Sequence, residues 1–428
     1  MNFLNRLISA RRGEERAVAL AFGYFFLLLC CYYLLRPLRD AMAATAGLGR
    51  LPELFTYTFL VMLAITPLFG TLVARVRKRL LLPITYLFFA SNMLLFVGLF
   101  HADPGSRTAA AAFYVWLSVF NMFVVSVFWS FMADIFRGGE AKRLFGPIAA
   151  GGSAGAICGP LLTQSLAVEV GPAGLVLLST LLLLLTIPLI GSLGRWSAHH
   201  HGEQELAAKS DGEGSIGGGA LGGVRALFSS SYLLGIASFL VIGAIVGTFM
   251  YIELQRLVFE AYPDVGDRTT FFARLDLAGN VLAMVLQGVV VSRIIARLGL
   301  VGGLVVMPLV ALTSFIWLLA VPMLMPLAVS QVLRRSGEFG LSKPSREVLY
   351  TAVDAETKYK AKNFIDTVVQ RGSDTAGSWL HGLLAVRGVA LDGFAAMSAL
   401  LMLILIGVGI ALARAFRLRE LATTGSQG

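Results

Sequence analysis

The chain has 428 residues, of which 57% are hydrophobic and only 14% are charged, and its mean hydropathy is +0.78. A soluble domain of this length would expose too much apolar surface to stay dispersed, so the composition excludes one and predicts lipid as the solvent. The net charge of +10 could suit a nucleic-acid-binding protein, but in a membrane protein an excess of arginine and lysine is typical of cytoplasmic loops.

The apolar residues fall into about twelve runs of the roughly 20 residues that a membrane-spanning helix needs. They predict an all-α integral membrane protein. Cys30, Cys31 and Cys158 lie inside such runs, so they are expected to be small buried hydrophobic residues rather than disulfide or metal ligands. The runs begin near Ala17, Leu51, Leu80, Ala109, Gly146, Gly174, Tyr232, Thr270, Gly303, Met323, Ala361 and Phe394.

Basic residues gather between alternate runs, as in "RVRKR" at 75–79 and "RGGEAKR" at 137–143. Because cytoplasmic loops carry the excess of lysine and arginine, this side is expected to face the cytoplasm, with both termini on it. The expected location is the cytoplasmic (inner) membrane, crossed many times.

The only long polar stretch, residues 194–231, falls at the midpoint of the chain and predicts a flexible cytoplasmic linker. It would join one six-helix bundle over 1–193 to a second bundle and a short tail over 232–428. The halves also share residues at nearly constant offsets. Gly70, Arg75 and Arg79 recur as Gly288, Arg293 and Arg297; Lys142, Gly152 and Ser153 recur as Lys362, Gly372 and Ser373; and Arg36 and Asp40 recur as Arg256 and Glu260.

Two repeated bundles of this kind are the architecture of the major facilitator superfamily, which this chain therefore resembles. The motif "GAICGP" at 155–160 also resembles the Gly-x-x-x-Gly-Pro kink on the fifth helix of antiporters in that superfamily. Small residues let helices approach closely, so ordinary tight packing explains the motif at least as well.

The first apolar run ends in "YYLLRPLRD" at 32–40. Arg36 and Asp40 are four residues apart and are expected to pair, as anchors at a helix end would. The alternative is a receptor for an anion that carries a ring, in which Arg36 and Arg39 hold phosphate and Tyr32 stacks or hydrogen-bonds. The recurrence of the pattern in the second half favours a site or its gate.

Three later runs carry charges that are costly in a membrane and therefore usually face a cavity or each other. On the eleventh, a polar stripe at helical spacing predicts either a water-filled path or a polar seam between helices, and Arg371 is placed to reach the path or pair with Asp374. On the tenth, Arg334 and Glu338 are spaced for an ion pair. The stripes are Asn363, Asp366, Gln370, Asp374, Gly377 and His381 on the eleventh, Asp276, Asn280 and Gln287 on the eighth, and Gln331, Arg335 and Glu338 on the tenth.

The segments "YYLLRPLRDAM", "FWSFMADIFRGGEAKRLFG" and "DAETKYKAKNFIDTVVQRGSD" resemble those of the ATP/ADP translocase (NTP/NDP exchange transporter) family. The resemblance implies nucleotide exchange across a membrane, with Arg39 and Lys362 at the positions of two basic residues that the family uses. The family also uses acidic residues on the fourth and seventh helices. Here the fourth offers only Ser118 and Asn121, and Glu253 on the seventh is displaced by about two residues.

The predicted function is secondary transport of an anionic, nucleotide-like metabolite by alternating access, in the manner of an exchanger. It implies no cofactor, no metal and no nucleic-acid partner, and a monomer in the lipid bilayer. One alternative is a proton-coupled exporter of amphipathic compounds, and another is a non-transporting receptor on the same scaffold. No enzyme motif occurs. The predicted substrate-binding residues are Tyr32, Arg36, Arg39, Asn121, Asn280, Lys362, Gln370 and Arg371, and the predicted coupling or gating residues are Asp40, Glu253, Arg256, Asp276, Arg335, Glu338, Asp366 and Asp374.

Overall fold

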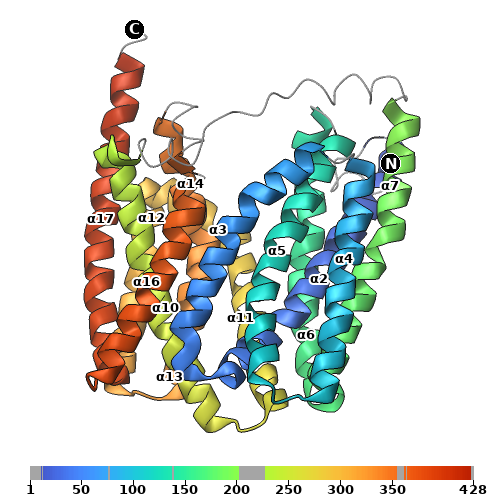
Figure 1. Ribbon diagram of the computed structural model, residues 1–428. Helices are drawn as coiled ribbons and strands as arrows, with labels where there is room; N and C mark the ends of the chain where they lie inside the picture. Colours follow the sequence, from blue (N-terminus) through green and yellow to red (C-terminus); the bar gives the residue numbers. More distant parts are fainter. Residues whose placement is uncertain are drawn as a thin grey trace. The chain divides into compact units, whose positions relative to one another are not determined.

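The computed structural model describes residues 11, 13–75, 78–136, 139–201, 227–353, 361–362 and 364–425, and every regular element in these ranges is a helix (Figure 1). Eight stretches of the described residues are long and apolar enough to cross a membrane. Two of them, Arg143–His200 and Val265–Ala320, span 58 and 56 residues, which is enough for two crossings each. These findings confirm the predicted fold class.

Each predicted run begins inside a helix or next to one. The longer helices are α2 (Glu15–Ala46), α3 (Leu51–Arg75), α4 (Lys78–Ala102), α5 (Arg107–Ile135), α6 (Gly139–Leu184), α7 (Thr186–His201), α10 (Ser231–Ala261), α11 (Val265–Val285), α12 (Val291–Ala320), α13 (Leu324–Gly337), α16 (Gln370–Val386) and α17 (Leu391–Gly425). Shorter elements are η1 (Leu48–Arg50), η2 (Leu286–Val290), η3 (Glu338–Ser342), α14 (Lys343–Leu349), η4 (Tyr350–Ala352) and η5 (Ile365–Val369).

The helices form two compact units. Unit 1 comprises the described residues of Met1–Gly47, Leu60–Ser215 and Tyr262–Leu277, and unit 2 those of Leu48–Phe59, Ile216–Ala261 and Ala278–Gly428. Unit 1 therefore holds α2, α4, α5, α6 and α7 with parts of α3 and α11, and unit 2 holds η1, the start of α3, α10, the rest of α11 and the later helices.

A sharp kink interrupts each of the two long helices α6 and α12. Gly171 within α6 has φ +64° and ψ −173°, and Gly299 within α12 has φ +62° and ψ −160°. Only glycine adopts this backbone conformation readily, because a Cβ would clash. Pro172 follows the first kink, where its fixed φ suits the first position of a helix. The predicted runs at Gly174 and Gly303 begin just after these kinks.

A glycine stripe holds α6 against α2 in unit 1. Gly151, Gly155 and Gly159 are spaced one turn apart, and a Cβ on each would lie 2.4, 2.3 and 2.8 Å from the backbone oxygens of Phe22, Phe26 and Cys30. Small residues at this spacing let two helix backbones come into contact. In lipid the hydrophobic effect does not drive helices together, so close packing of this kind holds them. The "GAICGP" motif thus serves tight packing, and Pro160 lies inside the helix.

The first residues of the chain that are described are tied to α6 by an ion pair. The Arg143 guanidinium donates two hydrogen bonds of 2.8 Å to the two carboxylate oxygens of buried Glu14, and the Arg11 backbone N–H donates a third, also 2.8 Å. The bonds from Arg143 lower the pKa of the Glu14 carboxyl from its ordinary value, outweighing burial, which acts in the opposite direction.

This arrangement predicts a pH-dependent stability. Glu14→Gln is expected to lower the stability of the protein in detergent by about 1–2 kcal/mol at neutral pH, because a bidentate charged pair is lost. Since the folded state depresses the pKa of Glu14, its contribution is complete above the unfolded value of about 4.3 and is lost as the pH falls through the folded value.

Melting temperatures of the wild type and of Glu14→Gln, recorded from about pH 7 downward, should therefore converge below about pH 4. Glu53→Gln is the matched control, since Glu53 is an exposed partner of Arg50. A gap between wild type and Glu14→Gln that stays constant with pH would contradict the assignment.

The end of α7 extends into the predicted linker. The helix continues to His201, so the expectation of a flexible loop over 194–201 was wrong. Trp196 explains why: its indole N–H donates to the Gly13 carbonyl at 3.0 Å, and its ring stacks on His200 with centroids 4.6 Å apart. His200 in turn lies 3.5 Å from Glu140. Residues 202–226 lie outside the described residues, so the linker and the 1–193 and 232–428 division remain predictions.

Unit 2 contains three single π-helical turns, η2, η3 and η5. A π-turn carries one residue more than an α-helical turn and leaves part of the backbone bonding irregular, and such turns occur often at functional sites. The Gln287 side chain in η2 donates 3.0 Å to the carbonyl of Phe339 in η3, so two of these turns support each other.

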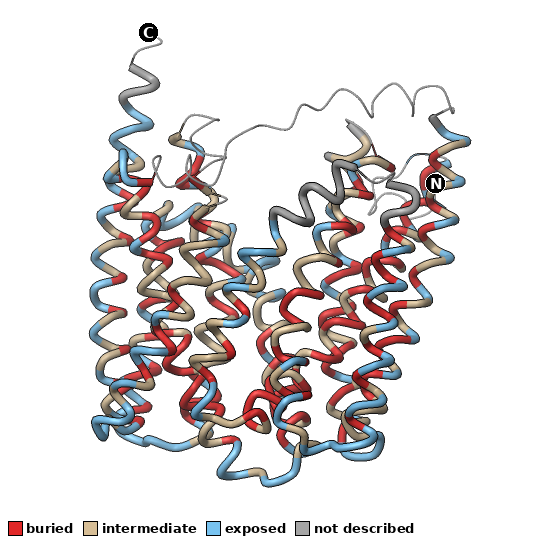
Figure 2. Tube along the Cα trace, viewed as in Figure 1, coloured by how far each residue is buried: buried red, intermediate tan, exposed pale blue. Residues whose placement is uncertain are grey.

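Exposed residues recur along the helices (Figure 2), and many of them have large apolar side chains. Examples are Phe88 and Leu95, each 60% exposed, and Leu181. In water such exposure would be costly, so it fits helices that face lipid. Cys30 and Cys31 are buried as predicted, and Cys158 is half-buried.

Candidate functional site

Unit 1 contains a cluster of two half-buried arginines and two buried aspartates, here called the arginine cluster: Arg36, Arg39, Asp40 and Asp276. An Arg36 Nη1 lies 3.4 Å from Asp276 Oδ1, and Arg39 donates to Asp40 Oδ1 from Nη2 at 2.7 Å and from Nε at 3.1 Å. Asp40, which its spacing would let Arg36 reach, is thus bound by Arg39 and also acts electrostatically on Arg36. The ion-pair partner of Arg36 is Asp276 on α11. Spacing along one helix could not predict this partner, because it lies on a distant segment of the chain.

Aromatic rings accompany both arginines. The Arg36 guanidinium lies 5.8 Å from the centroid of the Tyr33 ring, and that of Arg39 lies 5.0 Å from the Tyr114 ring on α5. These distances suit cation–π contacts. Tyr32, the predicted contact, is buried and packs edge-on against Tyr33, with centroids 5.1 Å apart. Sequence reasoning missed Tyr33, although it stands one turn before Arg36, and Tyr114, for which no local signal existed.

Asn121 lies on α5 two turns beyond Tyr114. Its side chain is half-buried and forms no hydrogen bond to the described residues. The structure therefore places Asn121 on α5, the helix that carries Tyr114, without joining it to the arginine cluster.

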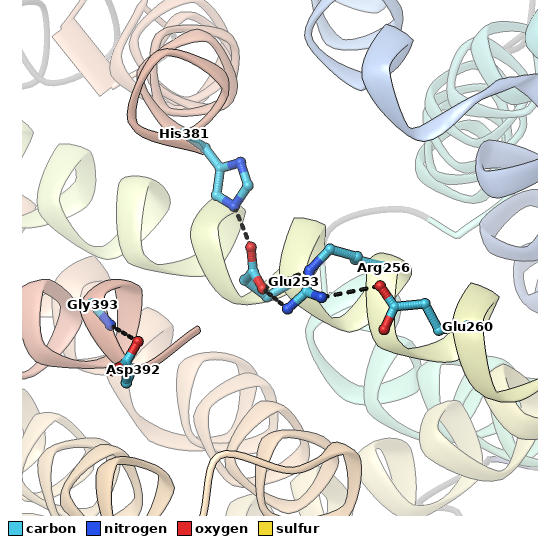
Figure 3. Close-up of polar contacts among 6 residues, drawn as sticks. All are labelled: Glu253, Arg256, Glu260, His381, Asp392 and Gly393. Atoms are coloured by element: carbon cyan, nitrogen blue, oxygen red, sulfur yellow. Dashed lines mark hydrogen bonds and ion pairs between the residues drawn. The ribbon is translucent and has the colours of Figure 1, made fainter. Parts of the chain in front are cut away.

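In unit 2, the carboxylate of Glu253 on α10 is bound by two side chains, one at each of its oxygens (Figure 3). Its Oε1 lies 2.8 Å from His381 Nε2 on α16, and its Oε2 accepts from Arg256 Nη2 at 2.8 Å and Nε at 3.1 Å. Arg256 also donates 3.0 Å to Glu260. Glu253 and His381 are only 3% and 6% exposed. A buried carboxylate needs such compensation, since an unpaired charge there would be strongly unfavourable.

Two phenylalanines enclose His381. The imidazole stacks on Phe394 of α17 with centroids 4.0 Å apart at 12°, and meets Phe249 of α10 edge-on at 5.9 Å. The helical spacing had placed His381 on the polar stripe of the eleventh span. Its acidic partner on another helix could not be read from that spacing.

The remaining predicted residues on α16 form a looser group. Gln370 donates 3.4 Å to Asp374 Oδ1, and Arg371 Nη1 lies 4.0 Å from Asp374 Oδ2, at the outer limit for an ion pair. Further along, Gly377 faces Ile245 and Thr248 of α10. The stripe thus packs partly against another helix, as the polar-seam alternative expected. Asn363 lies outside the described residues.

The predicted ion pair between Arg334 and Glu338 is absent from the described residues. Arg334 donates 3.1 Å to Gln331 and lies over Gly247 of α10, whereas Glu338 lies 3.2 Å from Arg346 Nη1. The π-turn η3 begins at Glu338, which changes the helical register on which the prediction depended.

Arg346 belongs to a charged cluster that sequence reasoning missed. Lys362 Nζ lies 2.6 Å from Glu347 and 5.9 Å from the Tyr350 ring centroid. Arg346, Lys362 and Glu347 all act electrostatically on Asp366. Lys362 and Asp366, which were predicted separately, are therefore brought together. The unnoticed signal was "SREVLY" at 345–350, which carries both missed charges.

Asn280 and Arg335 are half-buried on α11 and α13. Next to them, Ser336 donates 3.0 Å to the Gly279 carbonyl, so the two helices are in contact at this level. No group of three or more His, Cys, Asp or Glu side chains suited to hold a metal ion occurs among the described residues.

Comparison with known proteins gives these clusters a context. The sequence profile of the TLC ATP/ADP transporter family matches residues 109–421. The chain is 24% identical over 315 residues to ADP,ATP carrier protein 1 of Chlamydia muridarum (strain MoPn / Nigg), covering 65% of this chain and 59% of the relative. The same carrier of Chlamydia trachomatis serovar D is 23% identical over equal shares. The matched part of the chain thus spans about three fifths of the length of these curated relatives.

Solved transporter structures share the fold. A mutant of the nucleoside transporter NupG aligns with a TM-score of 0.63 at 12% identity, covering 94% of this chain and 99% of NupG. A bacterial homologue of the iron transporter ferroportin aligns with a TM-score of 0.65 at 14% identity, covering 93% and 98%. At these identities the likeness concerns the fold alone. Together with the family profile, which confirms the resemblance seen in the sequence, the comparisons show that the chain belongs to the TLC ATP/ADP transporter family.

Proposed function

We propose that this transporter exchanges nucleotides, or a closely similar phosphate-bearing anion, by alternating access across the cytoplasmic membrane, with both termini in the cytoplasm. The observation that carries the proposal is the arginine cluster of unit 1, in a chain of this family. Two half-buried guanidinium groups beside aromatic rings are a suitable receptor for phosphate attached to a ring system.

The pairing of the arginines suggests how an anion could be bound and released. Arg36 and Arg39 each have a carboxylate partner, so the cluster is charge-compensated when empty. A phosphate group would compete with Asp276 and Asp40 for the same donors, and these aspartates would take the arginines back when the anion leaves. Exchange of partners avoids leaving a buried charge unpaired at any stage.

The proposal also includes a group of basic and polar side chains in unit 2. Lys362, Gln370 and Arg371 are proposed as substrate contacts, because all three are partly exposed and two are cationic. Asn121 and Asn280 are also proposed as substrate contacts, with fewer observations in support. The proposed coupling or gating residues are Asp40, Glu253, Arg256, Asp276, Arg335, Glu338, Asp366 and Asp374.

Uptake of labelled ATP into proteoliposomes loaded with ADP tests the proposal. Uptake that requires internal ADP would support exchange. Uptake that is independent of internal nucleotide, or absent under all loadings while the protein is folded, would contradict it.

Lys362→Met is expected to lower the exchange rate at least tenfold, because a cation that binds phosphate contributes about 1.5–3 kcal/mol. Its pair with Glu347 is 35% and 40% exposed, so the melting temperature should change little. Arg50→Met removes a similarly exposed pair, with Glu53, and is the matched control, expected to transport as the wild type does. Equal effects of both substitutions would argue against a substrate contact at Lys362.

A further inference from the structure

Glu253 has both carboxylate oxygens occupied by different cationic or protonatable groups. Arg256 binds Oε2 through two nitrogens, and His381 binds Oε1 through one. Arginine remains charged at every physiological pH, so it stabilises Glu253 in its ionised form. Of the three side chains, His381 is the one whose ring can keep its bond to Glu253 whether or not its second ring nitrogen carries a proton.

The charges of the cluster favour uptake of one proton. Glu253, Arg256 and Glu260 together carry a charge of −1, and a protonated His381 would bring the four residues to zero (Figure 3). Because water screens the exposed Glu260, the balance depends mainly on the direct contact of His381 with the ionised carboxylate of Glu253, which favours the protonated imidazole. The stacked ring of Phe394 and the edge of Phe249 hold the imidazole in place while its charge changes.

The chain of contacts also leads from the buried ring to the surface. His381 and Glu253 side chains are 7% and 4% exposed, whereas those of Arg256 and Glu260 are 39% and 56% exposed. Water, and with it a proton, is therefore expected to reach the site from the side on which Arg256 and Glu260 are exposed; the guanidinium keeps its protons and does not relay one. Both α10 and α16 approach their C-terminal ends here, near the turn that leads to α17.

Other titratable or charged groups on the neighbouring elements do not pair with this site in the described residues. Asp392 at the start of α17 accepts from the Gly393 backbone N–H at 2.8 Å. The others on α10, α16 and the elements packed against them are Arg50, Glu53, Arg334, Arg335, Asp366, Arg371, Asp374, Arg387, Arg414, Arg417, Arg419 and Glu420, and none is within ion-pair distance of Glu253 or His381.

We propose that His381 and Glu253 form a proton-binding site, in which the imidazole takes the proton and the carboxylate, held by Arg256, balances its charge. The proton is a second ligand of the transporter, bound apart from the arginine cluster. This site goes beyond nucleotide exchange and does not depend on which anion is carried.

Nuclear magnetic resonance of the full-length protein in detergent micelles tests the site directly. With ¹³C in the histidine rings, the chain gives five ring signals, and that of His381 is identified by its loss in His381→Gln. If this variant does not fold, the ring current of Phe394 still marks the His381 signal in the wild type.

The expected result is one proton-dependent shift of the His381 signal between about pH 5 and pH 9. In Glu253→Gln the midpoint should move by at least one pH unit, because the balancing charge is gone. Glu347→Gln, which removes a carboxylate from a different ion pair, should leave the midpoint unchanged. A ring that stays protonated or neutral throughout, or a midpoint unaltered by Glu253→Gln, would overturn the proposal.

The titration is independent of transport, so its result stands even if ATP and ADP prove not to be substrates. If they are exchanged, the exchange rate should vary across the pH range of the titration in the wild type and lose that variation in His381→Gln. An unchanged pH profile in His381→Gln would also overturn the assignment.

Discussion

Replacing Arg36 by methionine is expected to abolish exchange and to destabilise the protein by about 3 kcal/mol, the lower end of the range for breaking a buried ion pair. Asp276, with only 3% of its side chain exposed, would lose the partner 3.4 Å away. Arg39 also acts electrostatically on Asp276, which is why the loss should not reach the upper end of that range.

The double variant Arg36→Met with Asp276→Leu separates stability from transport. Replacing both partners of a buried ion pair by apolar residues is often neutral or stabilising, so the melting temperature should return close to that of the wild type. Exchange should remain absent, because the cation that binds the anion is still missing. Transport by the double variant at the wild-type rate would show that Arg36 only supports the fold.

Melting in detergent and ATP uptake into ADP-loaded proteoliposomes measure the two effects. Arg274→Met is a suitable control, since Arg274 is an exposed arginine on the same helix as Asp276. It removes one positive charge without opening a buried pair, so both stability and exchange should stay near the wild-type values.

Gly155→Ala is expected to destabilise the protein by about 2–3 kcal/mol, within the range for overpacking a close contact. The added Cβ would stand 2.3 Å from the Phe26 carbonyl oxygen and 2.9 Å from the Cys30 nitrogen. Both are backbone atoms, so no side-chain rotation can relieve the clash. The two helices α2 and α6 would have to separate, and their other glycine contacts would loosen with them.

Gly146→Ala supplies the comparison on the same helix, because a Cβ at Gly146 would meet no atom within 4 Å. Alanine favours the helical state over glycine by about 1 kcal/mol in both variants, so the difference between them reports the contact alone. Melting temperatures in detergent measure it. If the two variants proved equally stable, the close approach of α2 and α6 would be refuted.

The membrane-spanning helices were predictable because each requires a long apolar run, which is a local property of sequence. Even the kinks at Gly171 and Gly299 separated runs that had been placed correctly. The end of α7 was not predicted correctly, because the contact of Trp196 with Gly13, which is distant in sequence, extends this helix. A helix boundary that depends on a tertiary contact has no signal in the local sequence.

The same distinction applies to the charged residues. That Arg36, Asp276 and Glu253 would be buried and compensated followed from the energy of placing charges in a membrane. Which partner each would find did not, because spacing reveals only neighbours on the same helix. Hence Arg36 with Asp40 and Arg334 with Glu338 were expected, and Asp276 and Arg346 were found as the actual partners of Arg36 and Glu338.

The π-turn η5 at Ile365–Val369 has a consequence for how sequences of this family diverge. An extra residue in a helix arises most simply as a one-codon insertion, and its loss would return the segment to regular α-helical geometry. Everything beyond it would then rotate by about 100°, the angle of one residue in a 3.6-residue turn. Asp374 and His381 would leave the faces they now occupy, so a gap of one residue before them in a relative would signal a reorganised second unit rather than a neutral change of length.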